Sequence, residues 1–418
     1  MTSTLRRGAC PSLSAPMATG DGLLARLNPR GGALSPPQLA GVAQAALRHG
    51  NGLVEITARG SLQIRGLRDE TVEPFTDAVA ALAIVSDEGV EVRSGALAGR
   101  DVSEIADPLP VAAAIRAGIS ARGLAGRLAP KVSVAVDGGG KLGLGALGAD
   151  LRLEALAGDG PARWRLSVAG RNGSRRGVLD RAPAEKAVER CLGCLAVLAA
   201  NGPASRARDL PWPALAQAGD NWAGDGRQEG ELPPTTSNPV MPVGEFLLRD
   251  GFVARGLALS FGQIGARELA AFAGQLAPDL ALRLAPGRGL LVLGLAPGDG
   301  ERLADMARNH GLVTQADDPR LRIAACAGAP ACASAYLPTR EIAAAIVAEE
   351  PGLLADGTTL HLSGCAKNCA KPAGPSLDLV GSRSGWTLEE HDMRADNERL
   401  QALMRIAARF GSQKRPSA

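Results

Sequence analysis

Four cysteines in the last quarter of the chain are spaced as a metal-binding motif. Cys326 and Cys332 have five residues between them, and Cys365 and Cys369 have three. Thiolates are soft ligands that suit iron–sulfur clusters and zinc. Zinc-binding pairs usually have about two to four residues between their ligands. The wider first gap therefore favours a cluster, and we predict that these four cysteines hold a 4Fe-4S cluster.

Small residues surround both cysteine pairs. Ala327, Gly328 and Ala331 lie in the first loop, and Gly364 and Ala366 flank the first cysteine of the second pair. Small side chains let backbone N–H groups come close to the sulfur atoms of a cluster. The alternative is that all four cysteines are structural and buried in a core.

The other cysteines and the histidines give weaker signals. Cys191 and Cys194 form a C-x-x-C pair in an expected amphipathic helix at 187–198. This pair is either a redox pair or, as we favour, two half-buried helix cysteines. His361 precedes Cys365 by four residues and could reach the metal site, although a structural role is favoured. No residue is predicted to be catalytic.

Bulk properties limit the class of protein. The chain has 418 residues, 45% of them apolar and 3% aromatic, and a formal net charge of +3. This length predicts two to four structural units. The charge is too small to indicate a nucleic-acid partner. There is no signal-peptide pattern and no strongly apolar stretch of about 18 residues, so we expect a cytoplasmic protein without a membrane span.

Two segments of the chain repeat the order strand, loop, helix, strand, turn, strand. The first covers 24–67 and the second 253–295. Their strands alternate in polarity, and their helices have apolar residues at helical spacing. Each unit is half of a two-layer α+β sandwich, so we predict that the two halves pair with pseudo-twofold symmetry.

The longer segment after the first repeat also has recognisable elements. We predict helices and strands in the order helix, three strands, helix, at 110–128, 132–136, 142–146, 164–169 and 183–200. The run Gly138–Gly140 is typical of a hairpin turn. The stretch 201–240 is rich in proline, glycine and polar residues, and we predict a linker there.

The cysteine spacing resembles that of the siroheme-dependent sulfite and nitrite reductases. Their Thr-x-Arg-x-x-x-Gln motif is present here from Thr57 to Gln63. Within that superfamily the chain is most similar to the precorrin-3B synthase family. The residues that carry this second resemblance are Arg7-Gly8-Ala9-Cys10-Pro11, Pro16-Met17-Ala18-Thr19-Gly20-Asp21-Gly22-Leu23-Leu24, Gly50-Asn51-Gly52 and Val92-Arg93-Ser94-Gly95.

The resemblance implies an α+β fold of the sulfite/nitrite reductase type, in which two ferredoxin-like half domains form a pseudo-twofold pair and alternate along the chain with two larger α/β units. The expected domains are an N-terminal segment with the first half domain (1–84), a first α/β domain ending in a linker (85–235), the second half domain (236–312) and a second α/β domain carrying the cluster (313–418).

The resemblance also implies an activity. Members of the precorrin-3B synthase family are monooxygenases that hydroxylate precorrin-3A at C20 and close a γ-lactone, in aerobic cobalamin biosynthesis. They use dioxygen, an iron–sulfur cluster and a separate non-haem iron. An NADH-linked reductase or a ferredoxin would supply electrons, since no Gly-x-Gly-x-x-Gly follows a strand. The alternatives are a siroheme-dependent sulfite or nitrite reductase and an iron–sulfur electron carrier.

An anionic tetrapyrrole needs cations around it, and arginine matches a carboxylate with two hydrogen bonds. Arg59, Gln63 and Arg65 are separated by even numbers of residues, so an extended stretch would place them on one face. The superfamily analogy adds Arg93 and Lys131. These five residues are our candidates for substrate binding.

Three further expectations concern the same site. Arg26 and Arg283 are weaker candidates for carboxylate binding. The turn that corresponds to the motif in the second repeat is Pro286-Gly287-Arg288-Gly289, which has lost the pattern, as expected if one half alone binds carboxylates. In the reductases the last cysteine bridges cluster and haem iron. A metal-free precorrin offers no iron, so Cys369 would be a cluster ligand that faces the substrate.

Overall fold

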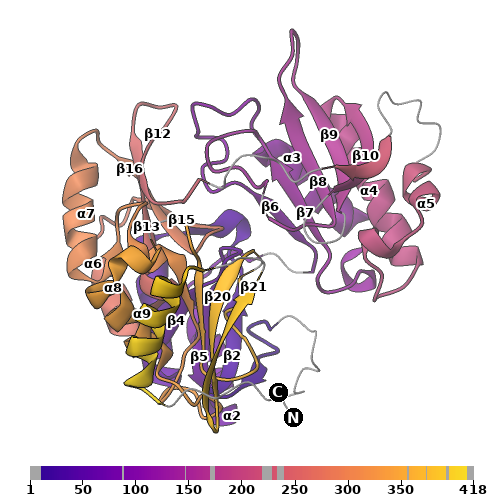
Figure 1. Ribbon diagram of the computed structural model, residues 1–418. Coiled ribbons are helices and arrows are strands. Elements are labelled where there is room, and N and C mark those ends of the chain that lie inside the picture. The colour runs from indigo at the N-terminus through magenta and orange to yellow at the C-terminus, as the bar shows by residue number, and fades with distance from the viewer. Residues whose placement is uncertain are drawn as a thin grey trace.

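The structure is a computed structural model, and it describes residues 11–86, 89–145, 147–169, 175–218, 228–232, 240–354, 357–372, 374–391 and 395–411. Its described part is a mixed α+β fold with four sheets, which confirms the expected fold class. One α/β unit, drawn in magenta, stands beside the other three sheets (Figure 1). Residues 7–10, part of the family resemblance, lie outside the described ranges.

The first half domain contains an antiparallel sheet with strand order β1-β2-β5-β4-β14. Its strands are β1 (Met17–Thr19), β2 (Gly22–Leu27), β5 (Leu62–Leu67), β4 (Leu53–Ile56) and β14 (Gln263–Gly265). Its helices are α1 (Pro36–His49) and α2 (Asp69–Ala80). Helix α1 begins with a capping box between Ser35 and Gln38, followed by proline in its first turn, a combination that fixes a helix start.

The second half domain has the same layout, with strand order β12-β13-β16-β15-β3. Its strands are β12 (Gly244–Leu247), β13 (Val253–Leu259), β16 (Gly289–Leu295), β15 (Ala281–Ala285) and β3 (Ala33–Leu34), and β17 (Leu312–Val313) pairs with β13. Its helices are α6 (Ala266–Gly274) and α7 (Asp299–Asn309). The predicted element order of both repeats is confirmed.

Each half domain contributes one short strand to the sheet of the other. Strand β14 pairs with β4, with Gln263 opposite Glu55. Strand β3 pairs with β15, with Ala33 opposite Arg283. The helices and sheets of both halves also share one apolar core, in which Phe272 is fully buried. The predicted pairing of the two halves is therefore present.

The first α/β unit is a mixed sheet with strand order β11-β10-β9-β8-β7-β6. Its strands are β11 (Gln228–Leu232), β10 (Arg175–Ala182), β9 (Arg163–Ala169), β8 (Leu151–Leu156), β7 (Ser133–Asp137) and β6 (Glu91–Ser94). Its helices are α3 (Leu109–Ala121), α4 (Ala184–Ala200) and α5 (Trp212–Ala216). Buried side chains from α3 and α4 form one core with the sheet.

Three expectations for this unit are wrong. Strands β7 and β8 are parallel, so Gly138–Gly140 begins a crossover and is not a hairpin turn. No strand forms at 141–145; this loop is held because Leu144 donates its N–H to Asp137 and accepts from Arg152. The expected linker 201–240 contains α5 and β11, which pairs with β10; 219–227 and 233–239 lie outside the described ranges.

The last unit is a four-stranded sheet covered by two helices. Its strands β18 (Ile323–Ala325), β19 (Leu360–Ser363) and β20 (Ser376–Ser382) are parallel, and β21 (Gly385–His391) is antiparallel to β20. Its helices are α8 (Thr339–Glu349) and α9 (Asn397–Ala408). Their apolar faces form a separate core with the sheet.

The search of the described residues for membrane spans found no helix of sufficient length and hydropathy. The cytoplasmic location and the domain boundaries at 84/85, 235/236 and 312/313 stay predictions.

The shared core of the half domains gives a stability prediction. Phe272→Ala removes a fully buried ring from it and should cost about 3–5 kcal/mol, seen as a lower melting temperature in circular dichroism. Leu47→Ala, on the exposed face of α1, is the control and should change the melting temperature little. Equal effects of both substitutions would contradict a common core.

Candidate functional site

The two cysteine pairs begin at the same edge of the last sheet. Cys326 directly follows β18, and Cys365 follows β19 by two residues. These strands are parallel neighbours, with Ala325 opposite Leu362, and the carboxyl ends of parallel strands meet at one edge. The backbone N–H of Cys326 extends this pairing by donating to the carbonyl of Leu362. Two motifs that are distant in sequence are thereby joined.

The thiols of Cys326, Cys332 and Cys365 all lie within electrostatic reach of Cys369. Burial raises the pKa of the Cys369 thiol, and the neighbouring Cys326, Cys365 and Cys332 raise it further, whereas Arg65 lowers it. Four thiols that share one site would repel as thiolates, and metal ions remove that repulsion. The donor set therefore fits a cluster with four cysteine ligands.

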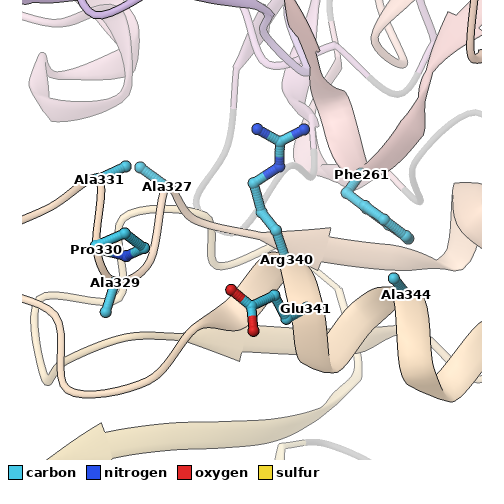
Figure 2. Close-up of a pocket in the computed structure, with 8 residues that line it drawn as sticks. All are labelled: Phe261, Ala327, Ala329, Pro330, Ala331, Arg340, Glu341 and Ala344. Atoms are coloured by element: carbon cyan, nitrogen blue, oxygen red, sulfur yellow. The ribbon is translucent and has the colours of Figure 1, made fainter.

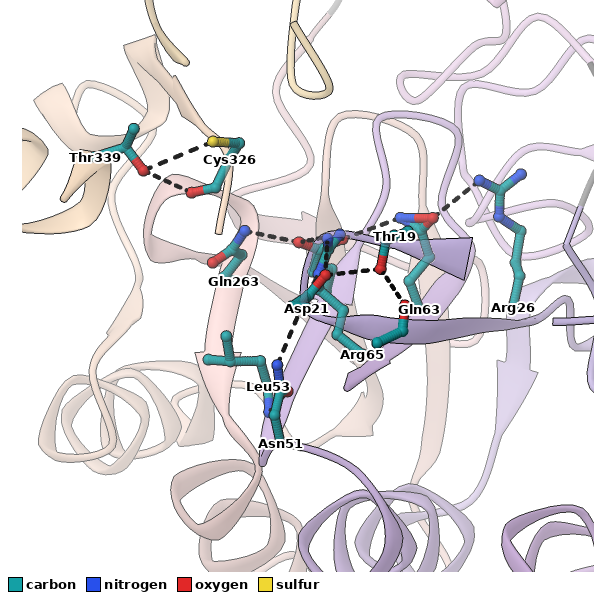
Figure 3. Close-up of polar contacts among 12 residues, drawn as sticks. Thr19, Asp21, Arg26, Asn51, Leu53, Gln63, Arg65, Gln263, Cys326 and Thr339 are labelled. Atoms are coloured by element: carbon teal, nitrogen blue, oxygen red, sulfur yellow. Dashed lines mark hydrogen bonds and ion pairs between the residues drawn. The ribbon is translucent and has the colours of Figure 1, made fainter. Parts of the chain in front are cut away.

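Backbone and hydroxyl groups support the cysteine loops. The N–H of Gly364 donates to Cys326 Sγ at 3.2 Å, and Thr339 Oγ1 donates to the carbonyl of Cys326 at 2.8 Å. Figure 3 shows Cys326 and Thr339 next to the polar network of the first half domain. A backbone donor aimed at a ligand sulfur stabilises its negative charge and tunes a cluster, in agreement with the small residues in these loops.

The hairpin between β1 and β2 closes over the first cysteine loop. A Cβ atom added to Gly20 would lie 2.4 Å from Cys332 Sγ. The Gly20 carbonyl accepts a hydrogen bond from the N–H of Ala333 at 2.8 Å. A side chain at position 20 would therefore displace the thiol or the loop.

His361 lies in the interior of the last sheet and not at its edge. Its side chain is fully buried on β19, and its Nδ1 is 3.4 Å from an oxygen of Asp378 on β20. Lys371 pairs with the other oxygen of Asp378 at 3.0 Å. Burial lowers the pKa of His361, against the opposing charge of Asp378. Within the described ranges no group of three or more His, Cys, Asp or Glu side chains is placed to hold a single metal ion.

A charged network covers the face of the first half domain next to the cysteines. Arg65 binds both oxygens of Asp21, with each nitrogen–oxygen distance 2.7 Å, and its third nitrogen is 3.4 Å from Glu55. The Asp21 side chain is fully buried. Burial would raise the pKa of Asp21, but the Arg65 guanidinium outweighs it and lowers that pKa. Arg65 is thus neutralised inside the protein and lies close to Cys369.

Amide side chains extend this network across two strands. Gln63 donates to Glu55 at 3.1 Å and accepts from Arg26 at 2.9 Å. Gln263, on the strand contributed by the second half domain, donates to the other oxygen of Glu55 at 2.7 Å. Figure 3 shows Gln263, Gln63 and Arg26 as members of this network, on either side of Arg65. Glu55 is therefore already occupied by three hydrogen-bond donors.

Arg59 and Arg93 meet at a second acid. Arg59 donates to Glu91 at 2.9 Å and to the carbonyl of Gly148 at 2.8 Å, and Arg93 pairs with the other oxygen of Glu91. Arg93 also donates to the carbonyl of Gly60. Burial would raise the pKa of Glu91, but Arg93 and Arg59 lower it below its ordinary value. The two arginines link the first α/β unit to the turn of the first half domain.

The five predicted substrate residues do not form one cluster. Gln63 and Arg65 belong to one network, Arg59 and Arg93 to a second, and Lys131 to neither. Gln63 and Arg65 share one face of β5, whereas Arg59 lies in the turn before that strand. The prediction that all three align along one extended stretch is therefore wrong. Lys131 is exposed just before β7, and in the described part of the chain it has no polar contact with the other four. The binding roles of all five stay predictions.

The weaker candidates Arg26 and Arg283 have different surroundings. Arg26 belongs to the Gln63 network. Arg283 lies on β15, where burial lowers its pKa and the nearby Arg100 lowers it further. The C-x-x-C cysteines lie on a helix, as favoured, but they are fully buried in the core of the first α/β unit and not half-buried, and burial raises the pKa of Cys194 to about 12.

Sequence reasoning missed the acids that hold these arginines. Glu55 is a charged residue on a strand between the apolar Val54 and Ile56, and Glu91 precedes Arg93 by two residues and so shares its face. Both signals were available in the sequence. Asp21 falls in the Thr-Gly-Asp-Gly run of the family resemblance, but its partner Arg65 could not be found without the fold.

The comparisons with known proteins agree with this geometry. The sequence profile of the Nitrite/Sulfite reductase ferredoxin-like half domain matches residues 15–82. A precorrin-3B synthase from Sinorhizobium sp is 40% identical over 388 residues, which are 92% of this chain and 83% of that protein. The chain belongs to the precorrin-3B synthase family. This similarity extends across both half domains and both α/β units.

The reductases are similar to a shorter part of the chain, or share its fold at low sequence identity. The sulfite reductase [NADPH] hemoprotein beta-component of Shewanella sediminis is 31% identical over 110 residues, 25% of this chain and 19% of that one. The solved structure of the Mycobacterium tuberculosis NirA protein superposes with a TM-score of 0.68 at 19% identity, covering 88% of this chain and 73% of that one. It shows the shared fold. Membership of the precorrin-3B synthase family thus rests on the longer match.

Loss of one cysteine ligand should remove the cluster. For Cys332→Ser we expect iron and sulfide content, and the absorbance of the cluster, to fall to a small fraction of the wild-type values, because serine is a poor ligand for a cluster. Cys194→Ala, which changes a cysteine buried in another unit, is the matched control and should keep both. Unchanged iron and sulfide in Cys332→Ser would remove the cluster assignment.

Closure of the N-terminal hairpin over Cys332 gives a second prediction. Gly20→Ala places a methyl group 2.4 Å from Cys332 Sγ, so the purified protein should contain less iron and sulfide than wild type. Gly274→Ala, at the end of α6 where an added Cβ meets nothing within 4 Å, is the control. If Gly20→Ala binds as much iron as Gly274→Ala, the hairpin does not restrict the cluster loop.

Proposed function

We propose that this protein is an oxygen-dependent monooxygenase that converts precorrin-3A to precorrin-3B by hydroxylation at C20 and formation of the γ-lactone. The observation that carries the proposal is the similarity over 92% of the chain to a precorrin-3B synthase. The site supports it, because a four-thiol donor set lies beside a face of the first half domain that is rich in arginine. An anionic macrocycle placed there would contact both.

In this proposal Cys326, Cys332, Cys365 and Cys369 hold a 4Fe-4S cluster. When bound, the cluster supplies electrons one at a time. The Gly364 N–H stabilises the charge on Cys326, and Gly20 leaves room for Cys332. Cys369 is the most exposed of the four and would face the substrate. The resemblance also implies a non-haem iron, to which we assign no residue of this chain.

The proposed roles of the polar residues follow from their present partners. Arg59 and Arg93 share Glu91, so a substrate carboxylate would compete with Glu91 for two guanidinium groups. Arg65 is held by Asp21 and Glu55 and positions charge beside Cys369. Gln63 offers an amide on the same face of β5. Lys131, exposed on the first α/β unit, is proposed to reach a peripheral carboxylate.

Dioxygen and an electron donor complete the proposed reaction. Insertion of one oxygen atom into the substrate, with the other released as water, consumes two electrons and two protons. A separate NADH-linked reductase or ferredoxin would supply the electrons to the cluster.

A siroheme-dependent sulfite or nitrite reductase is the second candidate. The match of the half-domain profile and the fold shared with the NirA protein favour it. The two candidates differ in colour, because a bound siroheme gives a strong Soret-type band, whereas an iron–sulfur cluster alone gives broad charge-transfer absorption. A purified protein with the Soret-type band would favour the reductase.

Labelled oxygen gives the decisive test. We expect the cluster-loaded protein, with a reductant and ¹⁸O₂, to convert precorrin-3A to a product whose mass includes the label, and to leave precorrin-3A unchanged under nitrogen. The Cys332→Ser variant is the negative control. A product without label, or no product from protein with full iron and sulfide content, would reject the monooxygenase assignment.

A further inference from the structure

Among the described residues, two arginines next to the site form no ion pair with an acid. Arg288 lies in the turn between β15 and β16, and Arg340 in the first turn of α8. Both are half-buried, burial lowers the pKa of each, and the nearby Glu55 opposes that effect. In the described part of the chain neither guanidinium forms an ion pair or a hydrogen bond. Isolated, partly buried cations are costly, so both positions need an explanation.

Glu55 does not neutralise them. Its two oxygens already accept hydrogen bonds from Gln63, Gln263 and Arg65. The other buried acid of the network, Asp21, is bound through both oxygens by Arg65 and also accepts hydrogen bonds from Thr19 and Asn51. The acids of this face are therefore used within the first half domain. They therefore form no ion pair with Arg288 of the second half domain or with Arg340 of the unit that carries the cysteines.

Arg288 is held in place by an unusual backbone. It has a φ of 66°, a left-handed conformation that is uncommon for a residue with a side chain. Its side chain packs on Gly262, where an added Cβ would lie 2.8 Å from Arg288 Cδ. Arg288 is also close enough to His361 to lower the pKa of that buried imidazole. The turn thus directs Arg288 inward, toward the cluster unit.

Arg340 is placed on the other side of the same segment. It lines a cavity of about 430 Å³ together with Phe261, which precedes Gly262, and with Ala327 and Ala331 of the first cysteine loop. Glu341 lines the same cavity but forms no ion pair with Arg340 in the described residues. Figure 2 shows the Arg340 guanidinium extended away from α8, between Phe261 and those two alanines. A cation in the first turn of a helix opposes the helix dipole. Its position therefore adds nothing to the stability of α8.

We infer that Arg288 and Arg340 form an anion-binding pair that takes peripheral carboxylates of the tetrapyrrole, at the edge of the site next to the first cysteine loop. The inference rests on the proposed function for its ligand. It changes one expectation from the sequence, because Arg288 comes from the second half domain, which we had expected not to bind carboxylates. The macrocycle would then be held by Arg59 and Arg93, which share Glu91, and also by Arg288 and Arg340.

The turns that carry Arg59 and Arg288 touch each other. The N–H of Gly287 donates to the carbonyl of Ala58 at 2.9 Å, and an added Cβ on Gly60 would lie 2.7 Å from the carbonyl carbon of Ala285. These turns occupy equivalent places in the two repeats. Each supplies one arginine at the junction, so the two cationic groups are fixed relative to each other by backbone contacts.

The test measures binding of stable porphyrins without turnover. An octacarboxylate porphyrin (uroporphyrin) and a tetracarboxylate porphyrin (coproporphyrin) are titrated into cluster-loaded protein and followed by fluorescence. Arg288→Gln and Arg340→Gln should each weaken uroporphyrin binding about tenfold or more, since each removes a charge-assisted contact. Both should also reduce the loss of affinity on adding salt. Iron content and melting temperature should match wild type.

Two controls separate charge from structure. Arg288→Lys keeps the cation and has the same backbone strain as Arg288→Gln, so it should recover most of the affinity. Arg267→Gln, on the exposed surface of α6, should bind as wild type does. Unchanged uroporphyrin affinity and salt dependence in both Gln variants would overturn the inference, as would wild-type protein that binds neither porphyrin.

The outcomes also separate this inference from the proposed reaction. If the Gln variants bind more weakly but wild type inserts no labelled oxygen, the arginine pair stands and the monooxygenase assignment fails. If wild type inserts oxygen and both Gln variants bind uroporphyrin as tightly as wild type, the reaction stands and the pair is wrong.

Discussion

The exchange of one short strand between the half domains is the constraint that positions the site. Strand β14 leaves the second repeat and joins the sheet of the first, so Gln263 reaches Glu55. Strand β3 makes the reverse exchange. Because two sheets and one core depend on both pairings, the halves cannot rotate against each other without breaking hydrogen bonds. The turns that carry Arg59 and Arg288 are thus fixed at one junction.

The two halves share an architecture but use their equivalent faces differently. In the first half, the face of β4 and β5 next to the cysteines carries Glu55, Gln63 and Arg65. In the second half, the corresponding face carries Arg283 opposite Leu291, and its other side chains form an apolar cluster with a loop of the first α/β unit. That cluster consists of Ala96, Leu97, Phe246, Leu248, Ala254, Ala285, Leu291 and Leu293. The face of the first half domain therefore lies next to the cysteines, whereas the equivalent face of the second half domain packs against another domain.

Patterns of neighbouring residues correctly predicted the features that depend on local structure. Alternation and helical spacing found both repeats, and cysteine spacing found a donor set that parallel strands bring together. Predictions that needed distant pairing failed. The glycines at 138–140 looked like a hairpin because the sequence does not show that β8 lies parallel to β7. The stretch near 230 looked like a linker because its pairing with β10 depends on residues far along the chain. The Arg59–Arg65 stretch looked continuous because the turn before Leu62 has no strong breaker beyond Gly60.

The acids were harder to predict than the bases. An arginine beside a motif suggests a ligand for an anion, but the sequence does not show whether an internal carboxylate already occupies it. Arg65 lies on β5 and Asp21 in the turn between β1 and β2, and Arg59 and Glu91 come from different units. From the sequence we therefore expected Arg65 to be available for a ligand, although internal acids already bind it. We did not select Arg288 and Arg340, because only the fold shows that neither forms an ion pair with another described residue.

The contact between Gly20 and Cys332 has a consequence for biogenesis. The two residues come from opposite ends of the chain, so the hairpin can close over the cysteine loop only after the C-terminal unit has been synthesised and folded. Until then the first cysteine loop is open to solvent on that side. A cluster bound as proposed would therefore enter most easily before the hairpin docks, and the docked hairpin would afterwards cover Cys332.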